Sequence, residues 1–267
     1  MGVSFRCRWL LPILASLSAG VVDGAGLRDG HISYAVHDVR IEADGHSVVA
    51  PKNAQLPDGF IRTGRDSRAE IGFSDKSVVR LGDNTVVKID SNSRTFDLES
   101  GAILTQVPSR VGGTFVKVRD VTATATGATL AVECLPNAYI KFISLDGTSR
   151  LCVKKGLLPS DCVLLRAGHM IIANPDPKML PESVDVDLNR LLQTSQFITQ
   201  FPPLAGRDRL VKAAAVQRDK KAHGSFADTN LVIFGRGTLV SRDGTPAQTQ
   251  NSSKPGRSPH QKAAPSQ

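Results

Sequence analysis

Aromatic residues and cysteines are scarce in this chain of 267 residues. Aromatics make up 5% of the sequence, with one Trp and two Tyr, so there is little material for a platform that stacks single-stranded nucleic acid or sugars. Four cysteines are too few for a disulfide-rich scaffold. The hydrophobic content of 40% nevertheless allows one buried core with appendages, which excludes a wholly disordered protein.

The net charge of +8 is concentrated at the C-terminal end. Residues 204–267 contain 11 Lys and Arg against 4 Asp and Glu, a net +7, which leaves 22 against 21 for residues 1–203. A nearly neutral folded body argues against a specific nucleic-acid partner, and we expect any polyanion affinity to lie in this region. A short helix over 207–221 is expected to be weakly formed and solvated, and the alternative is a helix that binds a membrane or a polyanion. Its candidate polyanion contacts are Arg207, Arg209, Lys212, Arg218, Lys220 and Lys221.

The N-terminus has the pattern of a secretory signal peptide. Two arginines precede an apolar run over 9–22, and small residues follow it. We predict a signal peptide at residues 1–24 and an exported product, periplasmic or secreted. The alternative is an uncleaved anchor, although the run is shorter than a membrane-spanning helix. No later segment is apolar over the length that would cross a bilayer, so we expect no transmembrane segment after cleavage.

Residues 33–174 repeat short alternating runs separated by Gly, Asp, Asn or Ser. In 67–73, for example, Ala69, Ile71 and Phe73 share one face. This pattern predicts an all-β domain, either a short-rung β-solenoid or a β-sandwich, whose strands each bury one face. A helical extension over 181–203 follows, with one helix over 181–197 behind a Ser183 cap that docks on the β-domain. The basic region 204–267 is expected to be largely disordered.

The segment LPDGFIRTGRDSRAEIGFSDKSVVRLGDNTVVKI at 56–89 resembles the signature half of a FecR domain. Weaker matches, such as 96–101 and 165–173, extend the resemblance over about 34–174. The resemblance implies a bacterial, extracytoplasmic β-domain. The signature turn and strand residues are Arg62, Thr63, Gly64, Ser67, Arg68, Ala69, Glu70, Asp75, Ser77, Arg80, Leu81 and Gly82.

The chain departs from the family pattern at two places. The expected Gly-Thr-x-Phe is replaced by Gly-Ala-Thr-Leu at 127–130. The best-known FecR proteins carry a cytoplasmic anti-sigma region and a transmembrane helix ahead of the domain, where this sequence shows an export signal. We therefore expect only the extracytoplasmic part of the family's role to apply.

Residues that carry catalytic or metal chemistry do not form a familiar pattern. The six histidines are scattered without metal-site spacing, and we predict no metal, cofactor or catalytic residue. Four carboxylates and four arginines on neighbouring strands are expected to lie on a solvated face, with Glu70 paired across strands. These residues are Glu70, Asp75, Asp97, Glu99, Arg62, Arg65, Arg68 and Arg80.

Three cysteines follow the predicted cleavage site. The segment 151–163 predicts a hairpin that places Cys152 opposite Cys162, and in an oxidising compartment the two could form a disulfide. Two buried thiols are the alternative. Cys134 alternates with Leu130 and Val132, and so it should be a small buried hydrophobe.

These observations favour a non-enzymatic exported module that binds an envelope protein or polymer through strand edges or loops. The alternative is a carbohydrate- or peptidoglycan-associated module that reaches an anionic surface with its basic tail. A hydrolase is the weakest hypothesis, because no nucleophile and base can be named.

Overall fold

The computed structural model describes residues 26–155 and 158–220. The predicted signal peptide and residues 221–267 of the basic region lie outside the described residues. No helix in the described part of the chain is long and apolar enough to span a membrane.

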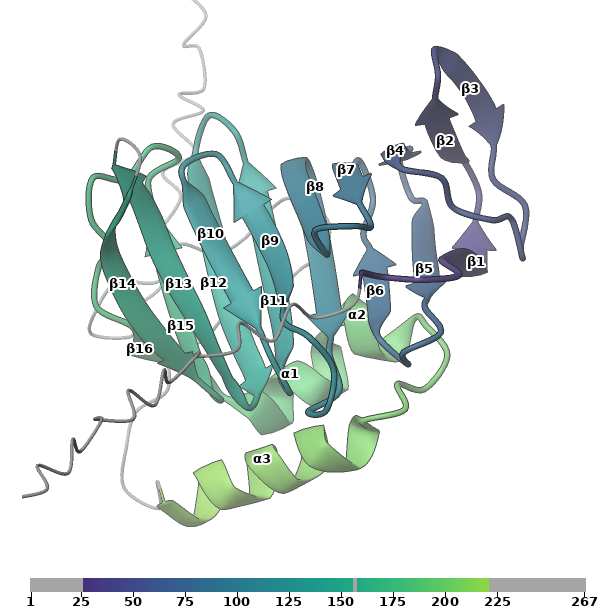
Figure 1. Ribbon diagram of the computed structural model, residues 1–267. Helices are drawn as coiled ribbons and strands as arrows, with labels where there is room; N and C mark the ends of the chain where they lie inside the picture. The colour runs from purple at the N-terminus through teal and green to yellow at the C-terminus, as the bar shows by residue number, and fades with distance from the viewer. Residues whose placement is uncertain (1–25, 156–157, 221–267) are drawn as a thin grey trace, which may run out of the picture.

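The protein is an all-β domain, as the sequence predicts, and it also contains three short helices. Most strands pair in antiparallel hairpins (Figure 1). The strands are β1 (His31–Val36), β2 (Val39–Ala43), β3 (His46–Val49), β4 (Gly59–Thr63), β5 (Arg68–Gly72), β6 (Val78–Leu81), β7 (Val86–Asp90), β8 (Thr95–Gln106), β9 (Thr114–Val118), β10 (Val121–Ala125), β11 (Thr129–Leu135), β12 (Tyr139–Asp146), β13 (Thr148–Lys155), β14 (Leu158–Arg166), β15 (His169–Ala173) and β16 (Val184–Asp185).

Two layers share the long strand β8. Sheet A runs in the order β1-β5-β6-β8-β11-β12-β15-β16. Sheet B runs in the order β3-β2-β4-β7-β8-β9-β10-β13-β14, and its β8–β9 pair is parallel. β8 passes from sheet B to sheet A at Gly101, whose φ of +87° is disfavoured for other residues. Gly101 is therefore a bend inside the continuous strand β8.

The chain winds between the two layers hairpin by hairpin. β9 and β10 lie in sheet B, β11 and β12 in sheet A, β13 and β14 in sheet B, and β15 and β16 in sheet A. The sequence was compatible with either a β-sandwich or a β-solenoid. The two face-to-face layers are those of a sandwich, and the alternation of hairpins between them gives the chain a solenoid-like winding.

The main core fills the space between the sheets. The inward residues expected from the alternation are buried here, among them Ile71, Leu81, Ile89 and Phe96. Cys134 also belongs to this core and is 1% exposed, as expected. Burial raises the pKa of its thiol to about 11.

A second core lies between the outer face of sheet A and the C-terminal helices (Figure 1). The helices are α1 (Leu188–Thr194), α2 (Gln196–Thr199) and α3 (Arg207–Lys220). Leu104, Ile143 and Met170 of sheet A pack against this layer. The prediction that each strand buries one face is therefore wrong for sheet A, and every residue of β12 is buried.

The helical extension docks as predicted but is divided differently. One helix was expected over 181–197 with a Ser183 cap. Instead, Val184 and Asp185 form β16, and Asp187 caps α1 by accepting a hydrogen bond from the Arg190 amide at 3.0 Å. The apolar spacing identified the buried face correctly, but Val184 belongs to a strand that continues sheet A.

Candidate binding surfaces and the signature residues

The FecR-like signature builds the turns at one end of the domain. The Thr63 hydroxyl donates to the Gly82 carbonyl at 2.6 Å and accepts from the Thr85 amide at 2.9 Å, which joins two neighbouring turns. Gly64 donates its amide to the Asp38 carbonyl at 2.9 Å. The Ser67 hydroxyl accepts from the Asp38 amide at 3.1 Å. These polar residues hold the backbone in place, and Ala69 and Leu81 fill the core between them.

Arg80 is a buried anchor for the helical layer. Its side chain is 1% exposed and its Nε donates to Glu70 Oε2 at 2.8 Å. The guanidinium also donates to the backbone carbonyls of Phe197 and Pro202, and it lies over the Phe201 ring at 4.9 Å. Burial lowers its pKa, and the nearby Glu70 carboxylate opposes that shift.

The expectation of a solvated arginine face is correct for some residues and wrong for Arg80. Alternation places Arg80 on the outer face of sheet A, as predicted, but the helices cover that face. Its pairing with Glu70 is the predicted one. Arg62 and Arg65 remain partly or largely exposed, and Arg62 pairs with Glu42 at 2.8 Å. The alternation in the sequence indicates on which face of a sheet a side chain lies, but not whether another element covers that face.

Arg94 is a second buried arginine, and its burial was not predicted from the sequence. It lies in the turn between β7 and β8 with φ +54° and is 3% exposed. Its Nη2 lies 2.7 Å from Asp75 Oδ2, and its Nε donates to the Gly113 carbonyl at 3.1 Å. Burial opposes the charged form of Asp75, but the Ser77 amide and Arg94 hold the pKa of this carboxyl below its usual range. Asp75 and Ser77 of the signature therefore belong to this polar network.

Asp83 is a buried carboxyl in the turn between β6 and β7. It is 8% exposed, and Asn84 Nδ2 donates to its Oδ2 at 2.9 Å. Burial raises the pKa of Asp83 to about 6, and the like charge of Asp66 adds to the shift. A carboxyl that titrates close to neutral pH was not visible in the sequence, since the Gly-Asp-Asn turn predicts an exposed side chain.

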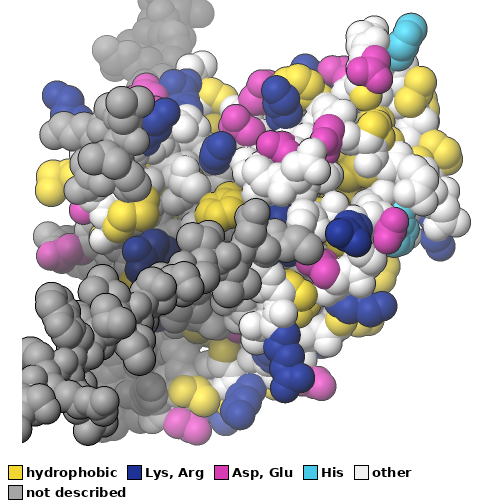
Figure 2. Space-filling view, in the orientation of Figure 1, with side chains coloured by type: hydrophobic (Ala, Val, Ile, Leu, Met, Phe, Trp, Pro, Cys, Tyr) yellow, Lys and Arg dark blue, Asp and Glu magenta, His cyan; other side chains and the backbone are white. Residues whose placement is uncertain are grey.

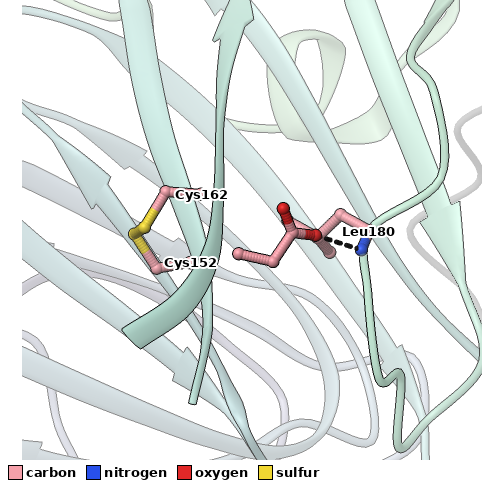
Figure 3. Close-up of a disulfide and its surroundings, with 4 residues drawn as sticks. Cys152, Cys162 and Leu180 are labelled. Atoms are coloured by element: carbon pink, nitrogen blue, oxygen red, sulfur yellow. Dashed lines mark hydrogen bonds between the residues drawn. A yellow bond between two sulfur atoms is a disulfide. The ribbon is translucent and has the colours of Figure 1, made fainter. Parts of the chain in front are cut away.

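A disulfide joins the directly opposed residues Cys152 and Cys162 of β13 and β14 (Figure 3). Both residues retain exposure to solvent, in contrast to the alternative of two buried thiols. Next to the disulfide, Asp161 accepts a hydrogen bond from the Leu180 amide at 2.8 Å. The bridge and this hydrogen bond tie β14 to its neighbour and to the segment that leads into the helices.

The basic residues predicted to contact a polyanion differ in their exposure and in their ion pairs. Leu210 and Ala214 of α3 are buried against the second core, so α3 is a docked helix and the basic region does not become separate at residue 204. Arg209 pairs with Asp146 at 3.2 Å and is partly withdrawn from solvent. The exposed cations of α3 are Arg207, Lys212 and Arg218, while the Lys220 side chain and Lys221 lie outside the description.

The β2–β3 hairpin projects from the body of the domain and ends sheet B (Figure 1). Among the described strands, β3 pairs with β2 alone, and all four of its residues are exposed. Val48 and Val49 are 56% and 59% exposed. In Figure 2 hydrophobic side chains occupy this end of the molecule with acidic ones nearby.

A cavity of about 390 Å³ lies beside this strand. Glu42, Asp44 and Asp58 contribute acidic side chains to its lining, together with His46 and the Phe60 ring. His46 and Ser47 of β3 line this cavity, and we call the exposed strand β3 together with the cavity the β3 edge. Among the described residues, no three His, Cys, Asp or Glu side chains come close enough to hold a metal ion together.

Residues 60–156 match the model of the FecR protein family. The match runs from β4 to the end of β13, and it confirms the resemblance to the FecR family seen in the sequence. The matched segment contains all twelve signature residues.

Two crystal structures resemble the chain, each described as a "putative anti-sigma factor" from Parabacteroides distasonis. The structure at 1.65 Å resolution is 16% identical, covers 47% of this chain and 59% of the solved chain, and has a TM-score of 0.40. The structure at 2.50 Å resolution is 15% identical, covers 51% and 64%, and has a TM-score of 0.42. The chain thus spans less than two thirds of either solved protein. No curated protein matches the chain.

Proposed function

We propose that this protein is a non-enzymatic, exported bacterial binding module that engages an envelope protein through the β3 edge. The observation that carries the proposal is an exposed, β-branched edge strand. Natural edge strands are usually protected by Lys, Pro, a bulge or a covering element, because unpaired backbone groups bind other strands. β3 has the sequence HSVV and contains neither Lys nor Pro.

An extended peptide from the partner would add one strand to sheet B. The Ala50 amide donates to the Val39 carbonyl at 2.8 Å. Because hydrogen bonding alternates along an antiparallel pair, the Val49 amide points away from β2 and is free to receive the partner. Main-chain hydrogen bonds supply affinity in this mode, and pockets for alternate side chains supply specificity. Glu42 is already paired with Arg62, and so Asp44 and Asp58 of the cavity are the acidic residues that favour Lys or Arg in the incoming segment.

Export is the second part of the proposal. It is supported by the sequence pattern of residues 1–24 and by the paired cysteines, since disulfides persist in oxidising compartments. In the periplasm or outside the cell, the natural partner of a FecR-type domain would be another envelope protein.

The test is site-specific photo-crosslinking in intact cells. A photoreactive residue at Val48 should capture one discrete envelope protein. The same residue at Val211 of α3, which is 53% exposed, is the matched control and should not capture it. Val49→Pro removes the outward amide without removing a β2–β3 hydrogen bond and should abolish the crosslink, whereas Val49→Thr should retain it. Equal capture at Val48 and Val211, or full capture with Val49→Pro, would contradict the proposal.

The carbohydrate or peptidoglycan alternative retains one supporting observation, the basic C-terminal region. Its candidate contacts are fewer than the sequence suggested, because Arg209 is engaged with Asp146. The salt dependence of binding to an anionic polymer tests this alternative.

A further inference from the structure

Strand β14 ends sheet B on the side opposite β3 (Figure 1), and among the described strands it pairs with β13 alone. The Ala167 amide, directly after β14, donates to the Gly147 carbonyl at 3.0 Å. Because hydrogen bonding alternates along an antiparallel pair, the backbone groups of Cys162, Leu164 and Arg166 point away from β13. No backbone hydrogen bond joins these groups to another residue in the described part of the chain. We call this row of unpaired groups, residues 162–166, the β14 edge.

Apolar side chains are exposed at the β14 edge. Leu164 is 58% exposed and Met179 is 70% exposed. Met179 directly precedes Leu180, whose amide donates to Asp161 of β14 at 2.8 Å, so both apolar side chains lie near this strand. The proline of β14, Pro159, precedes the β14 edge and removes no outward amide from it. Unpaired backbone groups beside apolar side chains bind further strands, so this edge is suited to accept one.

Helix α3 ends beside the β14 edge. Gln217 Nε2 donates to the Gly168 carbonyl at 3.4 Å, and Gly168 follows the last residue of β14 by two positions. Lys220, the last residue of α3, is three residues further along. When fully extended, residues 221–230 span about 33 Å, which is enough to reach β14. β3 lies at the far end of the nine strands of sheet B, about 38 Å away at the usual strand spacing, so β14 is the nearer edge.

The sequence after α3 contains one segment that is typical of a β-hairpin. Residues 231–240 read LVIFGRGTLV, two runs of strand-forming residues separated by Gly-Arg-Gly. The segment differs from the polar, Pro-rich sequence that follows residue 245, and it has the only run of four hydrophobic residues after α3. An isolated two-stranded hairpin is at best marginally stable in water. The segment therefore needs a sheet to which it can add.

From these observations we infer that residues 231–240 form a hairpin that pairs with the β14 edge and continues sheet B. The chain leaves α3 near the Arg166 end of β14, so the first strand, 231–234, runs antiparallel to β14. One face of this strand covers Leu164. β16, which ends sheet A on the same side, offers only two residues and is the poorer partner. The inference does not depend on the function proposed for the β3 edge.

This pairing continues the winding of the domain. The hairpins β9–β10 and β13–β14 lie in sheet B, and β11–β12 and β15–β16 lie in sheet A. A hairpin at 231–240 is the next one in sheet B, placed there after the helices. The part of the basic region that leaves the domain then begins at residue 241. Its lysines and arginines extend from the β14 side of the domain, away from the β3 edge.

Hydrogen exchange of the full chain, measured by NMR, tests the inference. The Leu164 amide points out of the sheet, so it exchanges quickly unless a further strand covers it. The double variant Val232→Pro, Ile233→Pro removes two successive amides, one of each orientation, so it disrupts the pairing in either register. The Leu164 amide should exchange roughly tenfold or more quickly in this variant than in the unmodified chain.

The double variant Gln248→Pro, Thr249→Pro is the matched control. It places two prolines in the polar sequence after residue 245 and should leave the exchange of the Leu164 amide unchanged. The outward amide of Val49 in β3 should exchange equally in all three proteins, which reports any general change in stability.

Three outcomes would overturn the inference. The first is rapid exchange of the Leu164 amide in the unmodified chain, and the second is equal acceleration in the two proline variants. The third is protection of Leu164 that appears only as the protein concentration rises, because a second copy of the chain would then cover the β14 edge. None of these results bears on crosslinking at the β3 edge, so the two proposals can fail separately.

Discussion

Arg80 of β6 and Phe201 of the C-terminal extension lie face to face, with the guanidinium carbon 4.9 Å from the ring centroid. The two residues are 121 positions apart, and between them they connect the FecR-type signature to the helical layer. The Phe201 ring also stacks on Phe197, at 6.2 Å between centroids, and packs near Tyr34 of β1 at 5.8 Å. One signature arginine thus holds a cluster of aromatic residues onto sheet A.

Replacing Arg80 should destabilise the whole protein. Arg80→Met leaves Glu70 without its buried partner and removes donors from two backbone carbonyls, so the free energy of unfolding should fall by about 3–5 kcal/mol. Urea denaturation measures this change. Hydrogen exchange should also accelerate in α1 and α2, because their anchor is lost. Arg65→Met, at an 89% exposed position, should have little effect, and equal losses for both variants would contradict the anchoring role.

The sequence predicted the strands and their inward-facing residues well, but it did not predict which elements cover the outer face of sheet A. Alternation identified the inward residues of β5 to β8 because half-buried strands repeat every two residues. The same pattern could not show that Arg80 lies beneath the helices, since covering depends on contacts across more than 100 residues. Arg94 was missed because a turn arginine is normally exposed. Its burial depends on Asp75 and Gly113, which come from other turns.

The candidate surfaces were harder to predict than the fold. β3 follows an ordinary hairpin pattern, and its position at the sheet edge comes from the order of all nine strands in sheet B. The ion pair between Arg209 and Asp146 depends on the docking of α3, a helix that the sequence predicted to be solvated. By contrast, local spacing was sufficient to predict the opposed cysteines of the β13–β14 hairpin.

Asp83 should make stability depend on pH. Its folded-state pKa of about 6 lies above the ordinary 3.8, so the folded protein binds more protons than the unfolded chain between these values. Stability should therefore fall as pH rises from about 4 to about 6 and stay lower above that range. Asp83→Asn should raise the free energy of unfolding at pH 8, by on the order of 2 kcal/mol, and change it little at pH 4.

Asp66→Asn tests how far the negative charge of Asp66 contributes to the raised pKa of Asp83. Asp66 has φ +55°, a conformation that Asn tolerates, so the turn should be preserved. NMR titration of Asp83 should then show a lower pKa than in the unmodified protein, though still above 3.8 because burial remains. An unchanged pKa would show that Asp66 does not contribute.

Cys152 and Cys162 should be linked in the exported protein. Peptide mapping without reduction should recover the bridged peptide, and finding both thiols free would contradict the prediction. The double variant Cys152→Ser, Cys162→Ser should lose about 2–3 kcal/mol of stability, because the bridge restricts the unfolded chain. Cys134→Ser is not a neutral control, since Cys134 lies in the core, so the reduced unmodified protein provides the comparison.

The basic C-terminal region should bind polyanions in a salt-dependent manner that the folded body does not share. Residues 221–267 contain 6 Lys and Arg and 2 Asp and Glu, a net +4. A chain ending at Lys220 retains α3 and both hydrophobic cores, and so it isolates this contribution better than a cut at residue 203. Each neutralised charge releases counterions, so retention of the full chain on an anionic polymer should fall steeply between low and physiological salt. The shortened chain should be retained weakly at both salt concentrations. Equal retention of the two proteins would contradict the prediction and place the basic site on the folded body. The exposed candidates there are Arg207, Lys212 and Arg218 of α3.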